Sequence, residues 1–158
     1  MPLSHNSSTM QSSPSADEPA STEADELTTR RAQLLALARE HDRSGLLLTS
    51  QASIAWYLGG ARVHVNIAAP PIAHVLVAPD GDTVLTLNIE APRLRDEELP
   101  PGIAVQALPW FADLASGVPA NILSENEIDS DLRALRASLT PTQESRYASL
   151  GADIARLM

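Results

Sequence analysis

The chain has 158 residues, no cysteine and a formal net charge of -9, and 44% of its residues are hydrophobic but only 3% aromatic. This composition suits one globular domain with a core of Leu, Val, Ile and Ala. The acidic balance argues against nucleic acid and anionic membranes as partners, and the lack of cysteine excludes disulfides and thiolate metal sites. Neither a secretory leader nor an apolar run of membrane-spanning length is recognisable, so we expect a cytoplasmic protein.

The first 24 residues are rich in Ser, Thr, Pro and Ala and almost free of large apolar side chains. Such a segment buries too little surface to offset the entropy of ordering it. We therefore expect residues 1–24 to form a disordered tail. Residues 25–43 carry Leu and Ala at helical spacing and are followed by Gly45, which predicts a helix with a glycine stop.

A mixture of short strands and helices follows. Residues 45–50 are an apolar run typical of a buried strand, and Ser50 or Ser53 suits the cap of a short helix ending before Gly59. Residues 62–68 alternate between polar and apolar side chains, which predicts a half-buried strand. Residues 72–78 and 83–87 flank a turn of sequence Pro-Asp-Gly-Asp, and together they predict a β-hairpin.

The second half of the chain predicts a helix over residues 90–99, a strand over 103–108, a turn or short helix from Pro109, an edge strand at 121–123 and a helix over 129–139. Thr140, Pro141 and Gln143 then have the spacing of a helix start. That last helix carries an apolar stripe of Tyr147, Leu150, Ile154 and Leu157. We expect an α/β fold in which a mixed sheet is flanked by helices, with a domain at 25–124 and a helical linker at 125–158.

Few residues are candidates for chemistry. Arg62, His64 and Asn66 would share one face of the predicted strand, either as a polar patch contacting a ligand or neighbouring subunit, or as an ordinary solvated face. One imidazole and one amide do not make a metal site, which needs three or more ligands. The acidic run at residues 96–98 lies among arginines and is typical of a solvated face with local ion pairs. No catalytic or metal-binding residue is predicted.

Five short motifs follow one another along the chain. They are residues 53–60 (Ser-Ile-Ala-Trp-Tyr-Leu-Gly-Gly), 75–82 (Val-Leu-Val-Ala-Pro-Asp-Gly-Asp), the acidic 90–99, 105–110 leading to Trp110, and 135–144 (Leu-Arg-Ala-Ser-Leu-Thr-Pro-Thr-Gln-Glu). Their kinds and their order resemble those of the N-terminal domain of the creatinase, prolidase and aminopeptidase P metallopeptidases. The resemblance covers about residues 27–158, although Gly60 and Ala61 stand where the family commonly has a Phe.

The resemblance implies a ribonuclease-H-like fold of the creatinase N-terminal type. It implies that full-length relatives cleave peptides next to proline with two divalent metals, which two Asp, a His and two Glu hold on a later pita-bread domain. No position of this chain matches those ligands, so no catalytic residue and no cofactor is carried over, and the chain alone is expected to be inactive. In relatives this domain mediates dimer contacts and can place residues at the mouth of the partner's active site. By their position in the chain, Arg62 and His64 are the candidates for that role here.

The leading hypothesis is a non-catalytic N-terminal domain of a proline-directed (Xaa-Pro) metallopeptidase, present as a fragment or truncated product, that contributes to dimerisation and active-site access. One alternative is a standalone interaction module or inert descendant that pairs with full-length relatives. Another is a small-ligand-binding domain that uses the face of Arg62 and His64. The expected partner is a second copy or a full-length relative. The stripe on the last helix should pack on the catalytic domain; in the isolated chain that helix should fray, fold back or drive self-association.

Overall fold

The computed structural model describes residues 18–66 and 68–157, which fold around one five-stranded sheet with strand order β4-β3-β2-β1-β5. Strand β2 is antiparallel to β1 and β3, whereas β1 is parallel to β5 and β3 is parallel to β4. The predicted α/β class, a mixed sheet flanked by helices, is confirmed. The strands are β1 (Gly45–Leu48), β2 (Ala73–Ala78), β3 (Gly81–Leu87), β4 (Ala104–Leu108) and β5 (Ile122–Ser124).

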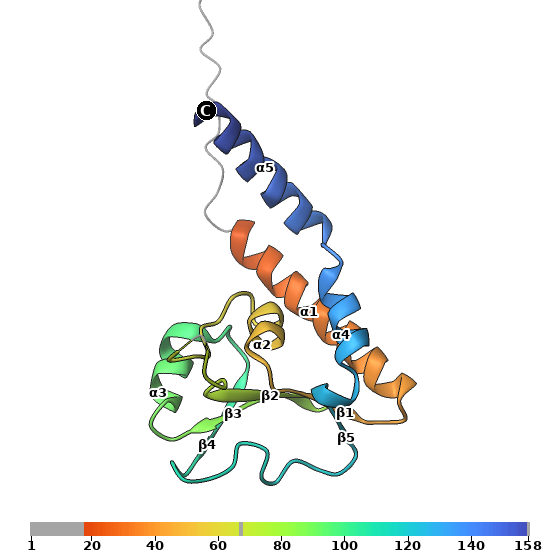
Figure 1. Cartoon of the computed structure of the whole chain (residues 1–158), viewed down its shortest axis with the longest axis vertical. Helices are drawn as coiled ribbons and strands as arrows, with labels where there is room; N and C mark the ends of the chain where they lie inside the picture. The colour runs from red at the N-terminus through yellow and green to blue at the C-terminus, as the bar shows by residue number, and fades with distance from the viewer. Residues whose placement is uncertain (1–17, 67, 158) are drawn as a thin grey trace, which may run out of the picture.

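Helices α1, α2 and α4 lie over one face of the sheet, and the long connection from β4 to β5 passes under the other (Figure 1). The hairpin of β2 and β3, the edge strand β5 and the helix that Pro141 begins were all predicted from sequence. The helices are α1 (Glu18–Glu40), α2 (Gln51–Tyr57), α3 (Ala91–Arg93) with the π-helical turn Leu94–Glu98, the 3-10 turn Glu125–Glu127, α4 (Asp129–Ala137) and α5 (Pro141–Leu157).

Helix α1 begins at Glu18, before the predicted start at residue 25. Residues 18–24, which the sequence assigned to a disordered tail, are therefore helical in the structure. The remainder of that tail, residues 1–17, lies outside the described residues. The predicted division into a tail, an α/β domain and a linker stays a prediction.

The core lies between the sheet and the three helices. Cross-strand partners share a face, and Leu46, Val77 and Leu123 meet at one level on the face that the helices cover. Burial of these apolar side chains is the main stabilising contribution to the domain. The fully buried helical residues that pack against this face include Leu34, Ile54, Tyr57, Leu94 and Leu132.

The strand predicted over residues 62–68 is wrong. Residues 62–66 and 68 are irregular, and residue 67 lies outside the described residues. Val63 is 1% exposed but Val65 is 79% exposed, so the expected apolar face does not form. The sheet explains why the segment does not pair with the strand it leads into: both edges of β2 are already paired, with β1 and β3.

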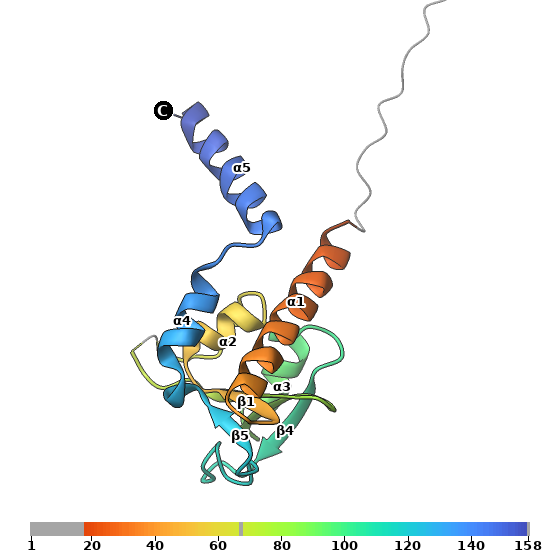
Figure 2. The ribbon, with the colours of Figure 1, turned by 90° about the vertical axis from the view of Figure 1, so that its right-hand side faces the viewer.

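Helix α5 leaves the domain as a separate arm, and it diverges from α1 in the view of Figure 2. Its start has the predicted cap, since the Gln143 backbone N–H donates to Thr140 Oγ1 at 3.2 Å and the Thr140 N–H donates to Gln143 Oε1 at 2.9 Å. Every residue from Glu144 to Leu157 is exposed. Within the described ranges, no helix combines the length and apolar character needed to cross a membrane.

Candidate functional site

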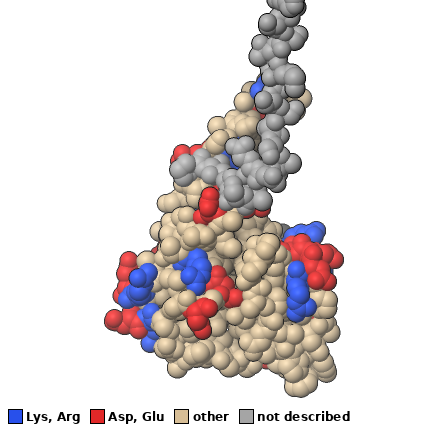
Figure 3. Space-filling view, turned by 180° about the vertical axis from the view of Figure 1, so that it is seen from behind, with Lys and Arg blue, Asp and Glu red and all other residues tan. Residues whose placement is uncertain are grey.

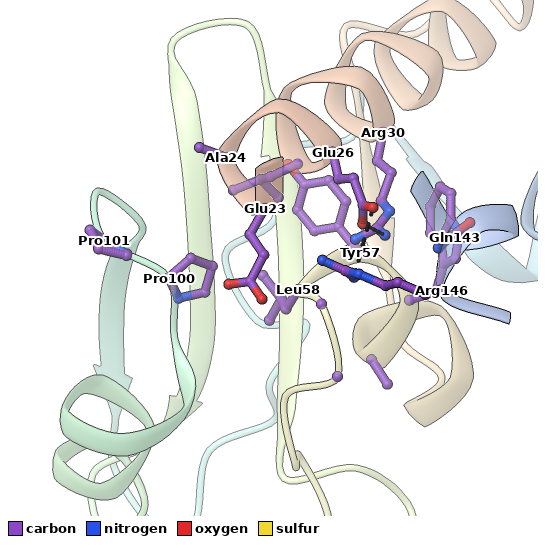
Figure 4. Close-up of a pocket in the computed structure, with 15 residues that line it drawn as sticks. Glu23, Ala24, Glu26, Arg30, Tyr57, Leu58, Pro100, Pro101, Gln143 and Arg146 are labelled. Atoms are coloured by element: carbon purple, nitrogen blue, oxygen red, sulfur yellow. Dashed lines mark hydrogen bonds and ion pairs between the residues drawn. The ribbon is translucent and has the colours of Figure 1, made fainter. Parts of the chain in front are cut away.

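A pocket of about 510 Å³ lies between α1, the end of α2, the loop after the π-helical turn and the first turns of α5 (Figure 4). Its apolar walls come from segments far apart in the sequence, so the fold alone brings them together. A volume of this size suits a small organic ligand. The walls are formed mainly by Leu27, Trp56, Leu58, Pro100 and Pro101, and the polar lining by Glu23, Glu26, Arg30, Gln143 and Arg146.

Two features of the local sequence open this pocket. Glu26 and Arg30 are four residues apart on α1, which places both on the helix face turned toward α2. Gly59 and Gly60 end α2 with positive φ values of 72° and 107°, a conformation that side chains other than glycine rarely adopt. A Cβ at either glycine would meet nothing within 4 Å, so this edge of the pocket is free of side chains.

A buried ion pair forms the polar end of the pocket. Arg30 Nη2 lies 2.6 Å from Glu26 Oε2, and the two side chains are only 6% and 8% exposed. The Arg30 guanidinium lies over the Trp56 ring at 5.7 Å from its centroid, a favourable cation–π arrangement. The third charge is Arg146 of α5, whose Nη1 is 3.9 Å from Glu26 Oε1.

This ion pair makes only one of the two parallel hydrogen bonds that an arginine and a carboxylate can form. Arg30 Nε and Glu26 Oε1 are both buried and have no hydrogen-bond partner among the described residues. An unpaired buried donor or acceptor costs stability. Arg30 Nε lacks an acceptor and Glu26 Oε1 lacks a donor, so a ligand group that offers both together, such as a carboxamide, has the complementary chemistry.

A second charged cluster holds the predicted candidate Arg62. Its Nη2 lies 2.7 Å from Glu98 Oε1, and its backbone N–H donates to Glu98 Oε2 at 2.8 Å. Arg93 adds a weaker contact to Glu98 at 3.4 Å. The Arg62 backbone N–H, together with the Arg62 guanidinium, lowers the pKa of Glu98 below its ordinary value. Glu98 makes the local ion pairs that the sequence predicted for the run at residues 96–98. Asp96 and Glu97 are exposed, as a solvated face requires, but the Glu98 side chain is only 5% exposed and is a positioned carboxylate.

His64 does not join this cluster. It is half-buried in the irregular segment, and its side chain takes part in none of the hydrogen bonds or ion pairs recorded between described residues. The common strand face that was to unite Arg62 with His64 and Asn66 does not form. A role for Arg62 and His64 at an interface or access route therefore stays a prediction, without support from a shared face.

A buried carboxylate that no local sequence pattern indicated, Glu125, lies between β5 and the start of α2. Its Oε2 accepts the backbone N–H groups of Thr49 and Ser50 at 2.5 and 2.8 Å, and its Oε1 accepts both the Ser50 and Ser53 hydroxyls at 2.6 and 2.5 Å. Burial by itself raises the pKa of Glu125, but the bonds from Ser50, Ser53 and the two backbone N–H groups outweigh it, so the pKa lies below its ordinary value.

The surface charges of the domain gather in small groups of both signs on the face shown in Figure 3. Such mixed groups are typical of local ion pairs, and they do not create an extended surface potential of one sign. Within the described part of the chain, no three His, Asp or Glu side chains lie close enough together to hold a metal ion.

No protein-family model and no curated protein sequence matches this chain. Among solved structures, one described as a proline dipeptidase from Streptococcus agalactiae 2603V is similar over 77% of this chain and 97% of that chain, with 15% sequence identity and a TM-score of 0.41. A likeness of this size supports no statement about activity or substrate. The α/β class of this domain follows from its own strand order and pairing.

Proposed function

We propose that this chain is a non-catalytic N-terminal domain of a proline-directed metallopeptidase, which contributes to dimerisation and to access to an active site supplied elsewhere. The proposal starts from the ordered motifs described above and from the family resemblance that they carry. In this role the chain alone hydrolyses no peptide, because two-metal hydrolysis needs bridging carboxylates gathered in one rigid site.

The observation that carries the proposal is the exposed apolar stripe of α5. Tyr147, Leu150, Ile154 and Leu157 are 63%, 54%, 49% and 88% exposed, although they recur at the spacing of one helix face. Apolar residues grouped in this way mark a contact surface. The domain itself leaves this surface uncovered, so we assign it to contacts with another polypeptide unit.

The linker keeps a fixed connection to the domain. Arg136, near the end of α4, donates from Nη1 to the Ser53 hydroxyl at 2.8 Å. Leu132 of the same helix is fully buried in the core. Helix α4 is therefore part of the rigid body, and it sets the point from which α5 departs. A module that positions a partner needs this kind of fixed origin.

A second surface supports a role in assembly. Trp110 and Phe111 follow β4, their rings meet edge to face at 5.7 Å, and they are 68% and 75% exposed. Ile89, which is 69% exposed, follows the neighbouring strand β3, and the Asn88 N–H donates to Leu108 O at 2.7 Å between the two strand ends. Exposed aromatic side chains of this kind are frequent anchors of protein interfaces.

The test compares the chain alone with the chain combined with a catalytic domain. We expect no hydrolysis of an Xaa-Pro dipeptide by the purified chain with Mn²⁺ present. We expect metal-dependent hydrolysis to rise when the chain is joined to the pita-bread domain of an Xaa-Pro peptidase. The matched control is the same fusion carrying Leu150→Glu and Ile154→Glu, which should lose the gain. Metal-dependent hydrolysis by the chain alone would overturn the proposal.

A second candidate function is the binding of a small ligand in the pocket beside Glu26 and Arg30. This function is favoured by the two buried atoms of the ion pair that lack a hydrogen-bond partner, Arg30 Nε and Glu26 Oε1. The pocket is a different surface from the Arg62 and His64 face that the sequence predicted for ligand binding. Benzamide should raise the melting temperature if it satisfies both atoms, whereas benzoate should not. Glu26→Gln should abolish the effect. Equal shifts with both compounds, or none with either, would count against this function.

A further inference from the structure

Helix α5 carries a heptad-like contact face. Tyr147, Leu150, Ile154 and Leu157 are separated by three, four and three residues, which is the spacing of a helix that pairs with another helix. Arg146 and Asp153 lie on one flank of this stripe, one heptad apart. Gly151 lies on the opposite flank, where a Cβ would meet nothing within 4 Å.

The charge of α5 favours a second copy of the chain as its partner. The chain as a whole has a formal charge of -9, so two copies repel each other at most surfaces. Within α5 the two acidic residues are matched by two basic ones, Arg146 and Arg156. Helix α5 is therefore a neutral apolar surface on an acidic protein, and it is where self-association meets the least repulsion.

We infer that α5 pairs with α5 of a second copy in antiparallel orientation, across a two-fold axis that passes close to Leu150. This rests on the proposed function insofar as that function assigns α5 to contacts outside the domain. A two-fold axis perpendicular to the helices makes the two copies of α5 antiparallel. It also places the same flank of the stripe in both copies side by side. Tyr147 and Leu150 of the two copies then pack around the axis.

The flanking charges select this orientation. Arg146 and Asp153 lie at equal distances on either side of the axis, so Arg146 of each copy faces Asp153 of the other. The pairing therefore contains two opposite-charge contacts. In a parallel pair, the flank of Arg146 faces the opposite flank of the second helix, which carries Glu144 and Gly151, and the heptad step sets Arg146 beside Gly151 and not beside Glu144. Neither charge then gains a partner, and the antiparallel pair is favoured.

The size of the surface sets the strength of the pair. Four large apolar side chains from each copy make an interface at the small end of those found in stable complexes. The dimer should therefore be weak and depend on protein concentration. Its two ion contacts are partly exposed, so added salt should weaken it further.

Sedimentation equilibrium of the whole chain over a range of concentrations tests the inference. The wild-type chain should pass from monomer to dimer, and Leu150→Glu should remain monomeric. Arg146→Glu and Asp153→Arg should each weaken association by roughly tenfold or more, because each creates two like-charge contacts. Circular dichroism shows whether each variant keeps its helix. Arg133→Glu, on α4 at a 71% exposed position, is the matched charge reversal and should leave association unchanged.

Mixing the two single variants gives the decisive result. Arg146→Glu in one chain faces Asp153→Arg in the other, and the unchanged Asp153 faces the unchanged Arg146, so the mixture should associate as strongly as the wild type. The double variant should do the same. This restoration does not depend on the contact between Arg146 and Glu26 within one chain. A wild-type chain that stays monomeric at every concentration, or a mixture that does not recover association, would overturn the inference.

These outcomes separate the inference from the proposed function. A chain that stays monomeric but supports metal-dependent hydrolysis after fusion overturns the helix pairing and leaves standing the part of the proposed function that concerns access to the active site. A chain that dimerises with the expected charge pattern but hydrolyses an Xaa-Pro dipeptide by itself overturns the proposed function and leaves the pairing standing.

Discussion

Ser53, in the first turn of α2, donates a hydrogen bond to Glu125 at 2.5 Å, although Glu125 follows 72 residues later in the chain. Glu125 lies just beyond the edge strand β5, and its other partners, Thr49 and Ser50, lie just beyond β1. Strands β1 and β5 run parallel, so their C-terminal ends lie side by side. The carboxylate that follows β5 therefore accepts hydrogen bonds from the backbone N–H groups that follow β1. Arg136 also bonds Ser53, which ties the linker to the same point.

Replacing Glu125 with Gln should destabilise the domain by about 2–3 kcal/mol, because hydrogen bonds to a buried charged acceptor are stronger than neutral ones and the new amide N–H₂ faces donors. Urea denaturation followed by circular dichroism measures this loss. Glu40→Gln, at an exposed position at the end of α1, is the matched control and should change stability little. Equal stability of Glu125→Gln and wild type would show that the Glu125 bonds contribute nothing net.

The same carboxylate predicts a pH dependence. Because the pKa of Glu125 is lowered in the folded state, its stabilising contribution is complete above the unfolded value of about 4.3. It is lost as the pH falls through the lower folded value. The free energy of unfolding of the wild type should therefore drop in acid, and that of Glu125→Gln should drop less steeply over the same range. Parallel pH profiles would contradict this. Glu98, whose pKa is also lowered, leaves some slope in both proteins.

Local patterns predicted most of the elements because each is encoded by neighbouring residues. The β2–β3 hairpin follows from the turn at Pro79 and Asp80, and the start of α5 follows from the capping spacing at Thr140. The strand predicted at residues 62–68 failed for a non-local reason. Alternation alone does not show whether a sheet edge is available, and here both edges of β2 are taken by strands elsewhere in the sequence.

The candidate site was less predictable than the fold. Ser50 and Ser53 were recognised as cap residues, but no local signal pointed to Glu125 as their acceptor. Glu26 and Arg30 are one of many acid–base pairs at helical spacing, and only the packing of α1 against Trp56 shows that this pair is buried. In both cases charge burial depends on segments far apart in the chain, which the sequence pattern does not reveal.

Tyr57→Phe should destabilise the domain by about 1–2 kcal/mol. The fully buried Tyr57 donates its hydroxyl proton to Asp82, whose 8% exposed side chain also holds Arg31 at 3.0 Å. Burial and the bond to Asp82 raise the pKa of Tyr57, so the hydroxyl stays protonated as a donor. Removing it leaves a buried carboxylate oxygen without that partner. Thermal unfolding of Tyr147→Phe provides the control, since Tyr147 is 63% exposed and should tolerate the change. Equal melting temperatures for Tyr57→Phe and wild type would contradict the prediction.

Gly45→Ala should destabilise the domain by about 1–3 kcal/mol, the usual cost of overpacking a well-packed core. A Cβ at Gly45 would lie 2.5 Å from the backbone oxygen of Val77 on the paired strand β2 and 3.1 Å from Cδ1 of Ile122 on β5. Backbone atoms within a sheet have little freedom to move aside, so β1 must shift between its two neighbours. Gly151→Ala is the opposite case, because a Cβ there meets nothing within 4 Å and alanine favours a helix interior. We expect the first variant to unfold at lower urea concentration than wild type and the second at an equal or higher one. If Gly45→Ala matched wild type, the close approach of β1 and β2 at this position would not constrain the fold.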